Sequence, residues 1–172
     1  MSNNLNNKKM LSLISIQNKK LNNFQKNNII HLKNEHWKYS ISEHNEYLKK
    51  NYKINDFHNL LFFKKKLIGY TGFRNRKFIY RGRKYKYLHF DCLIISKKFR
   101  KKKISKMLMK FNEINIKKKS LPSILFCEKK LTNFYKKFNW KFVNKKKIQL
   151  NLKLKPTKFI MGNNLRLRLL IK

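Results

Sequence analysis

The sequence predicts one domain of the α/β or α+β class. The chain has 172 residues, a length that suits one domain with a sizeable hydrophobic core. Hydrophobic residues make up 41% of the chain and aromatic residues 14%, which is enough apolar material for a packed interior. Segments with strand and helix periodicity alternate along the chain, and neither an internal repeat nor a linker interrupts them.

The N-terminal quarter predicts a strand followed by two helices. Residues 1–10 form a basic leader that we expect to be disordered, and residues 11–17 ("LSLISIQ") alternate as a strand does. Residues 19–34 place apolar side chains near helical spacing. A second helix is expected after Ser40, which forms a capping-box pattern with Glu43.

The next segment predicts strands joined by tight turns. Residues 57–74 indicate two strands that meet around the lysine turn at 64–66. Gly69 and Gly72 fall inside the second strand, which indicates a bulge or a close backbone approach. A further strand and turn are expected around Gly82.

The middle of the chain carries the clearest strand and helix. Residues 87–96 ("YLHFDCLIIS") are long and β-rich, and their end is apolar on both faces, as in a central strand. The helix expected after this strand has apolar residues on one face, namely Ile104, Met107, Leu108, Phe111 and Ile114.

The C-terminal third predicts a strand, a helix and a closing pair of strands. Residues 123–128 indicate a buried strand after Pro122. The following helix carries Leu131, Phe134, Tyr135 and Phe138 on one face and ends at Asn139, which tolerates a left-handed cap. "WKFVN" and "KIQLNLKLK" are expected to pair with each other. The domain is thus predicted over residues 11–155, followed by a basic tail over 156–172.

The positive charge is large but carries little information about function. Lys and Arg number 45 against seven acidic residues, giving a net charge of +38. Such a field favours anionic partners. However, alanine is absent and valine occurs only at Val143, as expected of an AT-rich genome. This nucleotide bias explains much of the lysine content.

The remaining composition favours a soluble cytoplasmic protein without a metal. Cys92 and Cys127 lie far apart in apolar runs without metal-ligand spacing, so we expect small buried hydrophobes in a reducing compartment. No apolar run approaches the roughly 20 residues that a membrane span requires. The first residues faintly resemble a signal peptide, but no small-residue cleavage site follows them.

A basic loop between a buried strand and a helix is the first candidate site. Residues 97–103 ("KKFRKKK") lead directly into a helix N-terminus near Ile104 and Ser105. Unpaired backbone N–H groups and a partial positive charge make such a terminus favourable for phosphate. Without further context, the residues alone favour the alternative, a solvated charged turn.

Two stretches give this loop a context. "LIISKKFRKKKISKMLM" has Arg100 at the start of a pattern that resembles the acetyl-CoA motif of the GNAT N-acetyltransferase superfamily. "LFCEKKLTNFYKKFNWKFV" is similar to a second motif of that family, with Tyr135, Asn139 and Trp140 at its key positions. The resemblance covers roughly residues 58–143. It implies a mixed, mostly antiparallel central sheet flanked by helices in a single domain, with acetyl-CoA as co-substrate.

The resemblance also implies which residues bind acetyl-CoA: Leu93, Ile95, Arg100, Lys101, Lys102, Lys103, Ile104 and Ser105. Lys103 stands where the motif has its first glycine, and Ser105 where it has a second glycine or alanine. A glycine lets the backbone approach pyrophosphate without a Cβ in the way. We expect Lys103 to donate its backbone N–H from an ordinary helical conformation. A catalytically degenerate binding module with this fold is the alternative.

For catalysis the resemblance implies direct acetyl transfer to a primary amine of a small molecule, with a base, an acid and an oxygen donor. Tyr135 matches the family's acid, and the alternative is a core tyrosine. Asp91 is the expected base, since an acid inside an apolar strand needs a reason. His89 lies on the same strand face by period 2 and is the reserve base, or else a half-buried structural histidine. A backbone N–H near Ile95 would hold the thioester oxygen.

The acceptor has one candidate. "LKNEHWKYSISEHNEYL" is similar to a stretch of GNAT members that acetylate amino groups on nucleotide-linked sugars. The match rests on Leu32, Asn34, Ser42 and His44, with Lys33 where arginine is usual. The resemblance therefore implies an amino-sugar nucleotide, whereas a simple capping box explains part of the same stretch.

A nucleic-acid- or ribosome-binding protein is the rival class. Its support is a set of basic runs with interleaved aromatic residues, at 64–66, 97–103, 117–119 and 145–147. These runs fall at predicted turns, and no nucleic-acid module signature accompanies them. We therefore expect only weak, salt-sensitive polyanion binding, and no oligomeric state is predicted.

Overall fold

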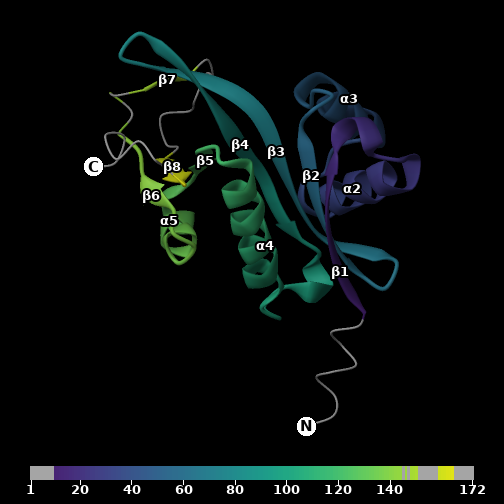
Figure 1. Ribbon diagram of the computed structural model, residues 1–172. Helices are drawn as coiled ribbons and strands as arrows, with labels where there is room; N and C mark the ends of the chain where they lie inside the picture. The colour runs from purple at the N-terminus through teal and green to yellow at the C-terminus, as the bar shows by residue number, and fades with distance from the viewer. Residues whose placement is uncertain (1–9, 145, 147, 151–158, 165–172) are drawn as a thin grey trace. The chain divides into compact units, whose positions relative to one another are not determined.

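The computed structural model describes residues 10–144, 146, 148–150 and 159–164 (Figure 1). Its strands form one mixed, mostly antiparallel sheet in the order β1-β2-β3-β4-β5-β8-β6, with β7 paired to β3. Strands β4 and β5 run parallel, whereas β1–β2, β2–β3 and β5–β8 are antiparallel. Helices flank the sheet, so the predicted fold class is confirmed.

The strands are β1 (Leu11–Gln17), β2 (Phe57–Phe63), β3 (Lys66–Tyr80), β4 (Arg83–Ile95), β5 (Ser123–Cys127), β6 (Lys141–Phe142), β7 (Gln149–Leu150) and β8 (Phe159–Asn163). The helices are α2 (Asn23–His36), α3 (Ile41–Asn51), α4 (Ile104–Lys119) and α5 (Lys129–Lys136), with short 3-10 turns η1 (Asn18–Lys20) and η2 (Lys97–Phe99). The predicted order of elements is correct as far as β5 and α5.

The chain divides into two compact units. The first unit comprises the described residues up to Arg74 together with Asp91–Phe111, and the second comprises Asn75–Phe90 and the described residues from Asn112 onward. Strands β3 and β4 and helix α4 contribute residues to both units.

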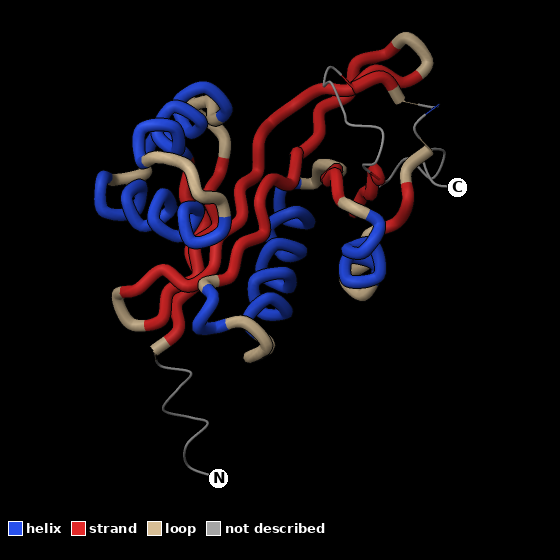
Figure 2. Tube along the Cα trace, turned by 180° about the vertical axis from the view of Figure 1, so that it is seen from behind, coloured by secondary structure: helices blue, strands red, loops and turns tan. Residues whose placement is uncertain are grey.

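Strands β2 and β3 carry the two faces of the first unit. One face carries Leu60, Phe62 and Tyr70, which pack with residues of α2 and α3. The opposite face carries Leu61 and Ile68, which pack with the first turns of α4. Figure 2 shows α2 and α3 together beside these strands. Strand β2 alternates by period 2, whereas in β3 a register shift opposite Leu61 and Phe62 puts Ile68 and Tyr70 on opposite faces.

Both helices of the first face begin with a capping box. The Ser40 backbone N–H donates to Glu43 Oε2 at 2.7 Å, and the Glu43 N–H donates to Ser40 Oγ at 3.1 Å, which confirms the predicted start of α3. Asn22 and Gln25 form the equivalent pair at the start of α2. The α2 cap was not predicted from the sequence.

The glycines confirm two predictions. A Cβ on Gly72 would overlap the hydroxyl and ring of Tyr52, so only glycine fits this close approach. Arg81 and Gly82 have φ values of 48° and 73°, and this left-handed pair makes the tight turn that joins β3 to β4.

The second unit has its own core, and its closing strands differ from the prediction. Strands β6 and β8 pair with each other, while β7 pairs with β3, so the stretches containing β6 and β7 do not pair with each other as predicted. Residues 151–155 of that predicted pair lie outside the described residues. Strand β6 pairs with β8 and not with β7, because β8 pairs with β5 along one edge and its other edge is open to β6.

Strand β8 lies within the segment predicted to be a basic tail. Its residues "FIMGN" pair with β5 from Ser123 to Cys127, and Met161 is completely buried. A five-residue apolar run between basic flanks gives a weak strand signal, which is why it was overlooked. Residues 156–158 and 165–172 of the predicted tail, and 1–9 of the predicted leader, lie outside the described residues.

Helices α4 and α5 bury a narrower face than expected. Ile114 and Leu131 are 63% and 41% exposed, although both were predicted to face the core. In α4 the buried row runs through Leu108, Asn112 and Ile116, four residues apart. None of the described helices is both long and apolar enough to cross a membrane.

We expect Gly72→Ala to lower the free energy of unfolding by about 2 kcal/mol, since the new methyl group must displace the buried Tyr52 ring. Urea unfolding monitored by circular dichroism measures this change. Gly82→Ala is the matched control: nothing lies within 4 Å of its Cβ position, so only the positive φ opposes it, at about 1 kcal/mol. Equal losses in both variants would contradict the close approach.

Candidate functional site

Strand β4 contains a left-handed residue near its C-terminal end. Cys92 has φ = 54°, a conformation that costs a residue with a side chain about 1 kcal/mol or more. A single left-handed residue inside a strand is the geometry of a bulge, which re-aims the side chains beside it. The strict period-2 alternation used to place His89 and Asp91 therefore stops at this point of the strand.

The Asp91 carboxylate beside this bulge accepts several hydrogen bonds. The hydroxyls of Tyr47 and Tyr52 each donate to Oδ2 at 3.0 Å. Arg74 Nε lies 3.5 Å from the same oxygen, in an ion pair whose side chains are only 9% and 13% exposed. The Cys92 thiol donates to Oδ1 at 3.4 Å, which is a weak hydrogen bond. The ionised carboxylate is therefore tied to α3, to β3 and to its own strand.

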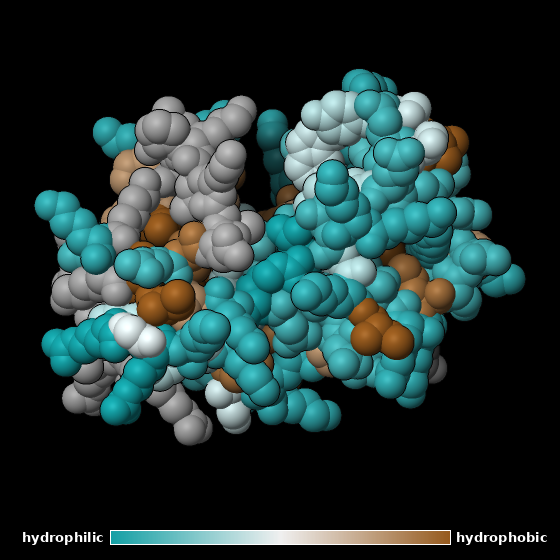
Figure 3. All heavy atoms as spheres, turned by 90° about the horizontal axis from the view of Figure 1, so that it is seen from above, coloured by the Kyte–Doolittle hydropathy of each residue, from teal (hydrophilic) through white to brown (hydrophobic). Residues whose placement is uncertain are grey.

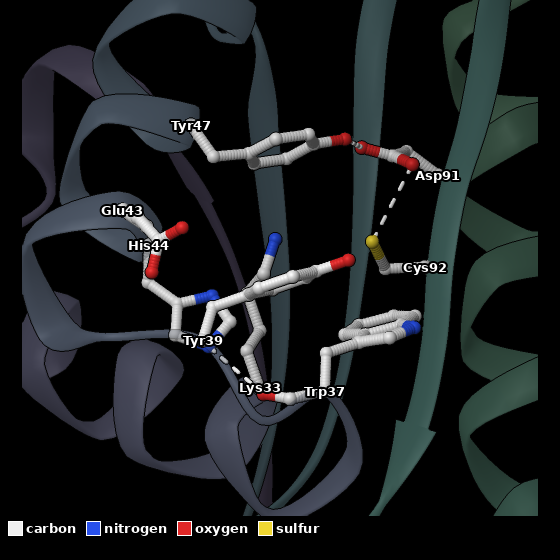
Figure 4. Close-up of a pocket in the computed structure, with 8 residues that line it drawn as sticks. All are labelled: Lys33, Trp37, Tyr39, Glu43, His44, Tyr47, Asp91 and Cys92. Atoms are coloured by element: carbon white, nitrogen blue, oxygen red, sulfur yellow. Dashed lines mark hydrogen bonds between the residues drawn. The ribbon is translucent and has the colours of Figure 1, made fainter.

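A pocket of about 470 Å³ opens in front of Asp91, within the first unit (Figure 4). Its walls come from the end of α2, the α2–α3 turn, α3 and β4. The lining residues are Lys33, Trp37, Tyr39, Glu43, His44, Tyr47, Asp91 and Cys92. Figure 4 shows the Tyr39 and Tyr47 hydroxyls pointing toward β4, where Asp91 and Cys92 lie. A volume of this size accommodates a small molecule.

Behind Asp91 a hydrogen-bonded chain runs into the core of the first unit. The Tyr70 hydroxyl donates to the Tyr52 hydroxyl at 3.1 Å, and His58 Nδ1 lies 3.0 Å from the Tyr70 hydroxyl. His58 Nε2 lies 3.0 Å from Asn18 Oδ1. His58 is completely buried, and its ring stacks on Tyr52 with centroids 4.6 Å apart. The chain links Asp91 to an asparagine that is not fully buried.

Burial sets the protonation of this chain. It raises the pKa values of Tyr47, Tyr52 and Tyr70, and the Asp91 charge adds to the effect, so all three remain hydrogen-bond donors. Burial lowers the pKa of His58 to about 4, with help from the Lys33 charge, so this ring is neutral at pH 7.

The Cys92 thiol is protonated as well, because burial and the Asp91 charge raise its pKa. A protonated thiol is not a nucleophile. The expectation of a small buried residue holds for Cys127 in the second unit, whereas Cys92 is only partly buried and lines the pocket.

The basic loop differs from the prediction in its backbone. Lys103 has φ = 58° and not the ordinary helical value expected from the sequence. Lys101 is also left-handed, with φ = 62°, while Lys102 between them is not. Residues that alternate between right- and left-handed conformations turn their N–H groups toward one side and form an anion-binding nest, so this loop is a candidate nest. The left-handed Lys103 adopts the conformation that a glycine would take without strain.

Helix α4 begins directly after this nest. The Met107 N–H donates to the Lys103 carbonyl at 3.3 Å, so the N–H groups of Ile104, Ser105 and Lys106 precede the first intrahelical bond. Ile104 is buried against Leu93, Ile95 and Phe99, whereas Lys101, Lys102 and Lys103 are exposed. The structure therefore brings all eight predicted cofactor-binding residues into the first unit.

The C-terminal end of α2 anchors the loop. Glu35 accepts hydrogen bonds from Ser96 Oγ at 3.3 Å and from the Lys97 N–H at 3.1 Å. Arg100 Nε donates to the Ile95 carbonyl at 3.2 Å, and its Nη2 lies 3.4 Å from His36 Nδ1. Burial and the neighbouring Arg100 charge lower the pKa of His36. Sequence reasoning missed Glu35, although an acid among only seven in the chain was an available signal.

Two predicted catalytic residues belong to the second unit. His89 is 7% exposed and packs edge-on against Phe126, with ring centroids 5.0 Å apart. Tyr135 is 8% exposed and lies edge-on to Phe90 and Trp140. Asn139, predicted to end α5, has φ = 62° and donates from its amide to Glu113 at 3.2 Å. The structure thus gives His89 an aromatic environment and Asp91 a pocket.

Two of the residues that suggested an amino-sugar nucleotide, Asn34 and His44, bond to backbone carbonyls of the α2–α3 turn. His44 Nε2 lies 3.2 Å from the Trp37 carbonyl. The Asn34 amide, turned with its nitrogen toward the turn, donates to the carbonyls of Trp37 and Tyr39. Leu32 is buried in the core, and Ser42 is exposed. This turn carries two of the pocket's aromatic walls.

The basic runs lie at turns and ends of elements. Residues 64–66 form the β2–β3 turn, 97–103 the β4–α4 loop and 117–119 the end of α4. Residues 145 and 147 of the fourth run lie outside the described residues. The face drawn in Figure 3 is mostly hydrophilic, with isolated hydrophobic side chains between polar ones.

Comparison with known proteins identifies the family. A sequence model described as an acetyltransferase (GNAT) domain matches residues 17–159. The chain belongs to the GNAT acetyltransferase family. This confirms the resemblance inferred from the loop at Arg100 and the Tyr135 motif, and no curated protein is similar enough in sequence to count as a match.

Solved structures share the GNAT fold at low identity. ElaA from Escherichia coli superposes with a TM-score of 0.66 at 15% identity, covering 90% of this chain and 99% of that one. An acyl-CoA N-acyltransferase from Pseudomonas aeruginosa gives 0.65 at 13%, covering 89% and 99%. The PaiA N-acetyltransferase from Thermoplasma acidophilum, in complex with coenzyme A, gives 0.54 at 18%, covering 88% and 98%.

We expect the free energy of unfolding of Lys103→Gly to exceed that of Lys103→Ala by about 1 kcal/mol, because only glycine adopts a φ of 58° without strain. Denaturant unfolding measures this difference. Both variants lack the lysine charge, so the comparison isolates the Cβ. At Lys102, where φ is ordinary, glycine should be no better than alanine. If Lys103→Ala proved as stable as Lys103→Gly, the left-handed conformation would be wrong.

The lowered pKa of His58 predicts a pH dependence of stability. Between pH 6.5 and about 4 the unfolded chain binds a proton at His58 that the folded chain does not, so stability falls as the pH falls through this window. The loss is about 3 kcal/mol. The difference in unfolding free energy between the protein and His58→Gln should shrink by that amount from pH 7 to pH 4. Parallel curves for the protein and His58→Gln would overturn the assignment.

Proposed function

We propose that the protein is an acetyl-CoA-dependent N-acetyltransferase that acts on the primary amine of a small molecule. The observation that carries this proposal is the left-handed nest at Lys101 and Lys103 leading into α4. The family resemblance implies a glycine at this place of the acetyl-CoA motif, and Lys103 here takes a left-handed conformation that a glycine would adopt without strain. Membership of the GNAT family and the CoA complex of the PaiA enzyme support the choice of co-substrate.

The nest and the start of α4 would hold the pyrophosphate of acetyl-CoA. Backbone N–H groups of residues 101–106 and the positive end of α4 favour phosphate oxygens at this place. The exposed lysines around them add attraction. Glu35 would keep the loop in position, since its carboxylate holds Ser96 Oγ and the Lys97 N–H.

Asp91 would act as the base. Acetyl-CoA supplies an activated acetyl thioester, and the amine must lose a proton before it can attack. Two tyrosine hydroxyls and Arg74 lie against Oδ2 of Asp91, and the Cys92 thiol, a weak donor, lies against Oδ1. A substrate ammonium in the pocket would donate to this carboxylate and transfer its proton to it. The pocket environment favours Asp91 over His89 for this role.

Tyr135 would protonate the leaving sulfur. Its assignment rests on the resemblance of its motif to that of the family. Its rigid setting against Phe90 and Trp140 fits a residue whose hydroxyl must be fixed in direction. The strand segment near Leu93 and Ile95, after the bulge, would supply the N–H that holds the thioester oxygen, as the family resemblance implies.

Calorimetric titration tests the co-substrate. We expect one equivalent of acetyl-CoA to bind at moderate salt, more tightly than dephospho-CoA or an unrelated nucleotide. Arg100→Glu should weaken binding at least tenfold, because it reverses the charge and removes the bond to the Ile95 carbonyl. Lys110→Glu, an equal charge change on the exposed face of α4, should weaken it far less. Binding that is no tighter than to any polyanion, and that fades with salt, would favour the nucleic-acid alternative.

Steady-state kinetics test the acid. Tyr135→Phe should lower kcat about a hundredfold while the Kd for acetyl-CoA changes less than twofold, since general acid catalysis contributes roughly 10²–10⁴. Tyr87→Phe, a change at another buried tyrosine of the second unit, should leave kcat nearly unchanged. An equal loss of kcat and affinity in Tyr135→Phe would assign Tyr135 to the core alone.

A further inference from the structure

A buried ammonium group ends in the pocket in front of Asp91. Lys33 lies in the last turn of α2 and is 3% exposed. Its Nζ lies 3.8 Å from the centroid of the Tyr47 ring and 5.6 Å from that of Trp37. Figure 4 shows the side chain rising from α2 with its nitrogen beneath the Tyr47 ring. Among the described lysines, Lys33 is the one that is buried and lines this pocket.

No anion among the described residues forms an ion pair or hydrogen bond with this ammonium. Asp91 lines the same pocket, but its charge is matched by Arg74 at 3.5 Å. Glu43 also lines the pocket, yet it is exposed and its Oε2 accepts from the Ser40 N–H at 2.7 Å. Within the described residues that line this pocket, the Lys33 ammonium is therefore a buried charge without an ion-pair partner.

Ring faces and the end of α2 offset only part of the cost of burying this charge. A cation over an aromatic ring is stabilised far less than a cation paired with an anion at the same depth. The C-terminal end of a helix adds a modest attraction for a cation. A ligand that brings an anionic group into the pocket would complete the pairing.

We infer that the amine substrate carries an anionic group, a carboxylate or a phosphate, which pairs with the Lys33 ammonium. This inference rests on the proposed function, since it assigns the acceptor of the same reaction. The substrate's ammonium would face the Asp91 carboxylate, and its anionic group would lie against Lys33 Nζ. Trp37 and Tyr39 would cover its carbon skeleton.

Asp91 and Lys33 would thus select a substrate that carries both a cationic and an anionic group. Asp91 favours a cationic nitrogen, and Lys33 opposes a second one through like-charge repulsion. Amines with several positive charges, such as polyamines, are therefore poor candidates. The volume of about 470 Å³ restricts the class to small molecules such as amino acids and phosphorylated amino sugars.

The test uses substrate pairs that differ only in the anionic group. An amino acid is compared with its carboxamide, and an amino sugar 6-phosphate with the unphosphorylated amino sugar. We expect the anionic member of one pair to have at least a tenfold higher kcat/KM. If the amino acid pair shows this preference, the anionic group is a carboxylate; if the amino sugar pair shows it, the group is a phosphate.

The variants assign the preference to Lys33. Lys33→Met keeps the aliphatic stem, so it should raise KM for the anionic member at least tenfold, with little change in kcat and none for the neutral member. Lys33→Arg should retain most of the preference, and the exposed Lys38→Met should retain all of it. A preference for neutral members, or equal losses for both members in Lys33→Met, would overturn the inference.

Calorimetry separates this inference from the proposed function. The anionic amines are titrated into the protein with and without acetyl-CoA, and into Lys33→Met. If no acetyl transfer occurs but anionic amines bind and Lys33→Met abolishes that binding, the proposed function fails while the Lys33 site stands. If acetyl transfer occurs but anionic amines bind no better than neutral ones, only the assignment of Lys33 fails.

Discussion

The contacts of the Asp91 carboxylate hold α3, β3 and β4 of the first compact unit together. The carboxylate lies in β4 and accepts from Tyr47 in α3 and Tyr52 directly after α3, and it pairs with Arg74 in β3. Removing it would leave Arg74 as an uncompensated charge with 9% of its side chain exposed, which typically costs about 3–5 kcal/mol. The residue proposed as base is therefore also the residue that ties α3 to the sheet. Loss of activity in an Asp91 variant would report both roles at once.

The same carboxylate explains how β4 holds a strained residue. Cys92 is left-handed, and the hydrogen bonds on both oxygens of its neighbour fix the backbone on one side of it. Tyr52 in turn is held by Tyr70 and stacks on His58, and it fills the space that Gly72 leaves open. Local strain of this kind persists only where the surroundings determine it from several directions. The bulge is thus a property of the packed unit and not of the strand's own sequence.

This dependence explains which parts of the molecule the sequence could predict. The capping box at Ser40 and the turn at Gly82 involve residues at most three apart, and both were predicted correctly. Asp91 was identified because an acid inside an apolar strand is unusual. Its partners could not be identified, since Tyr47 and Tyr52 are 44 and 39 residues away, and Glu35 is 61 residues from Ser96. The pairing of β6 with β8 was missed for a similar reason, because β8 is placed by its pairing with β5, which is distant in the sequence.

Lysine in this chain has meaning only through position. The chain has 45 basic residues against seven acids, and most lysines of its described part lie on the surface. Their number says more about codon usage than about partners. Lys103 and Lys33 are different, and for opposite reasons. At Lys103 the backbone takes a left-handed conformation that glycine adopts without strain, so what matters is the main chain while the side chain is exposed. At Lys33 the side chain is buried with its charge beneath an aromatic ring, so what matters is the ammonium itself. A charge that is retained where burial is costly, beside the carboxylate that organises the unit, points to a ligand of opposite sign.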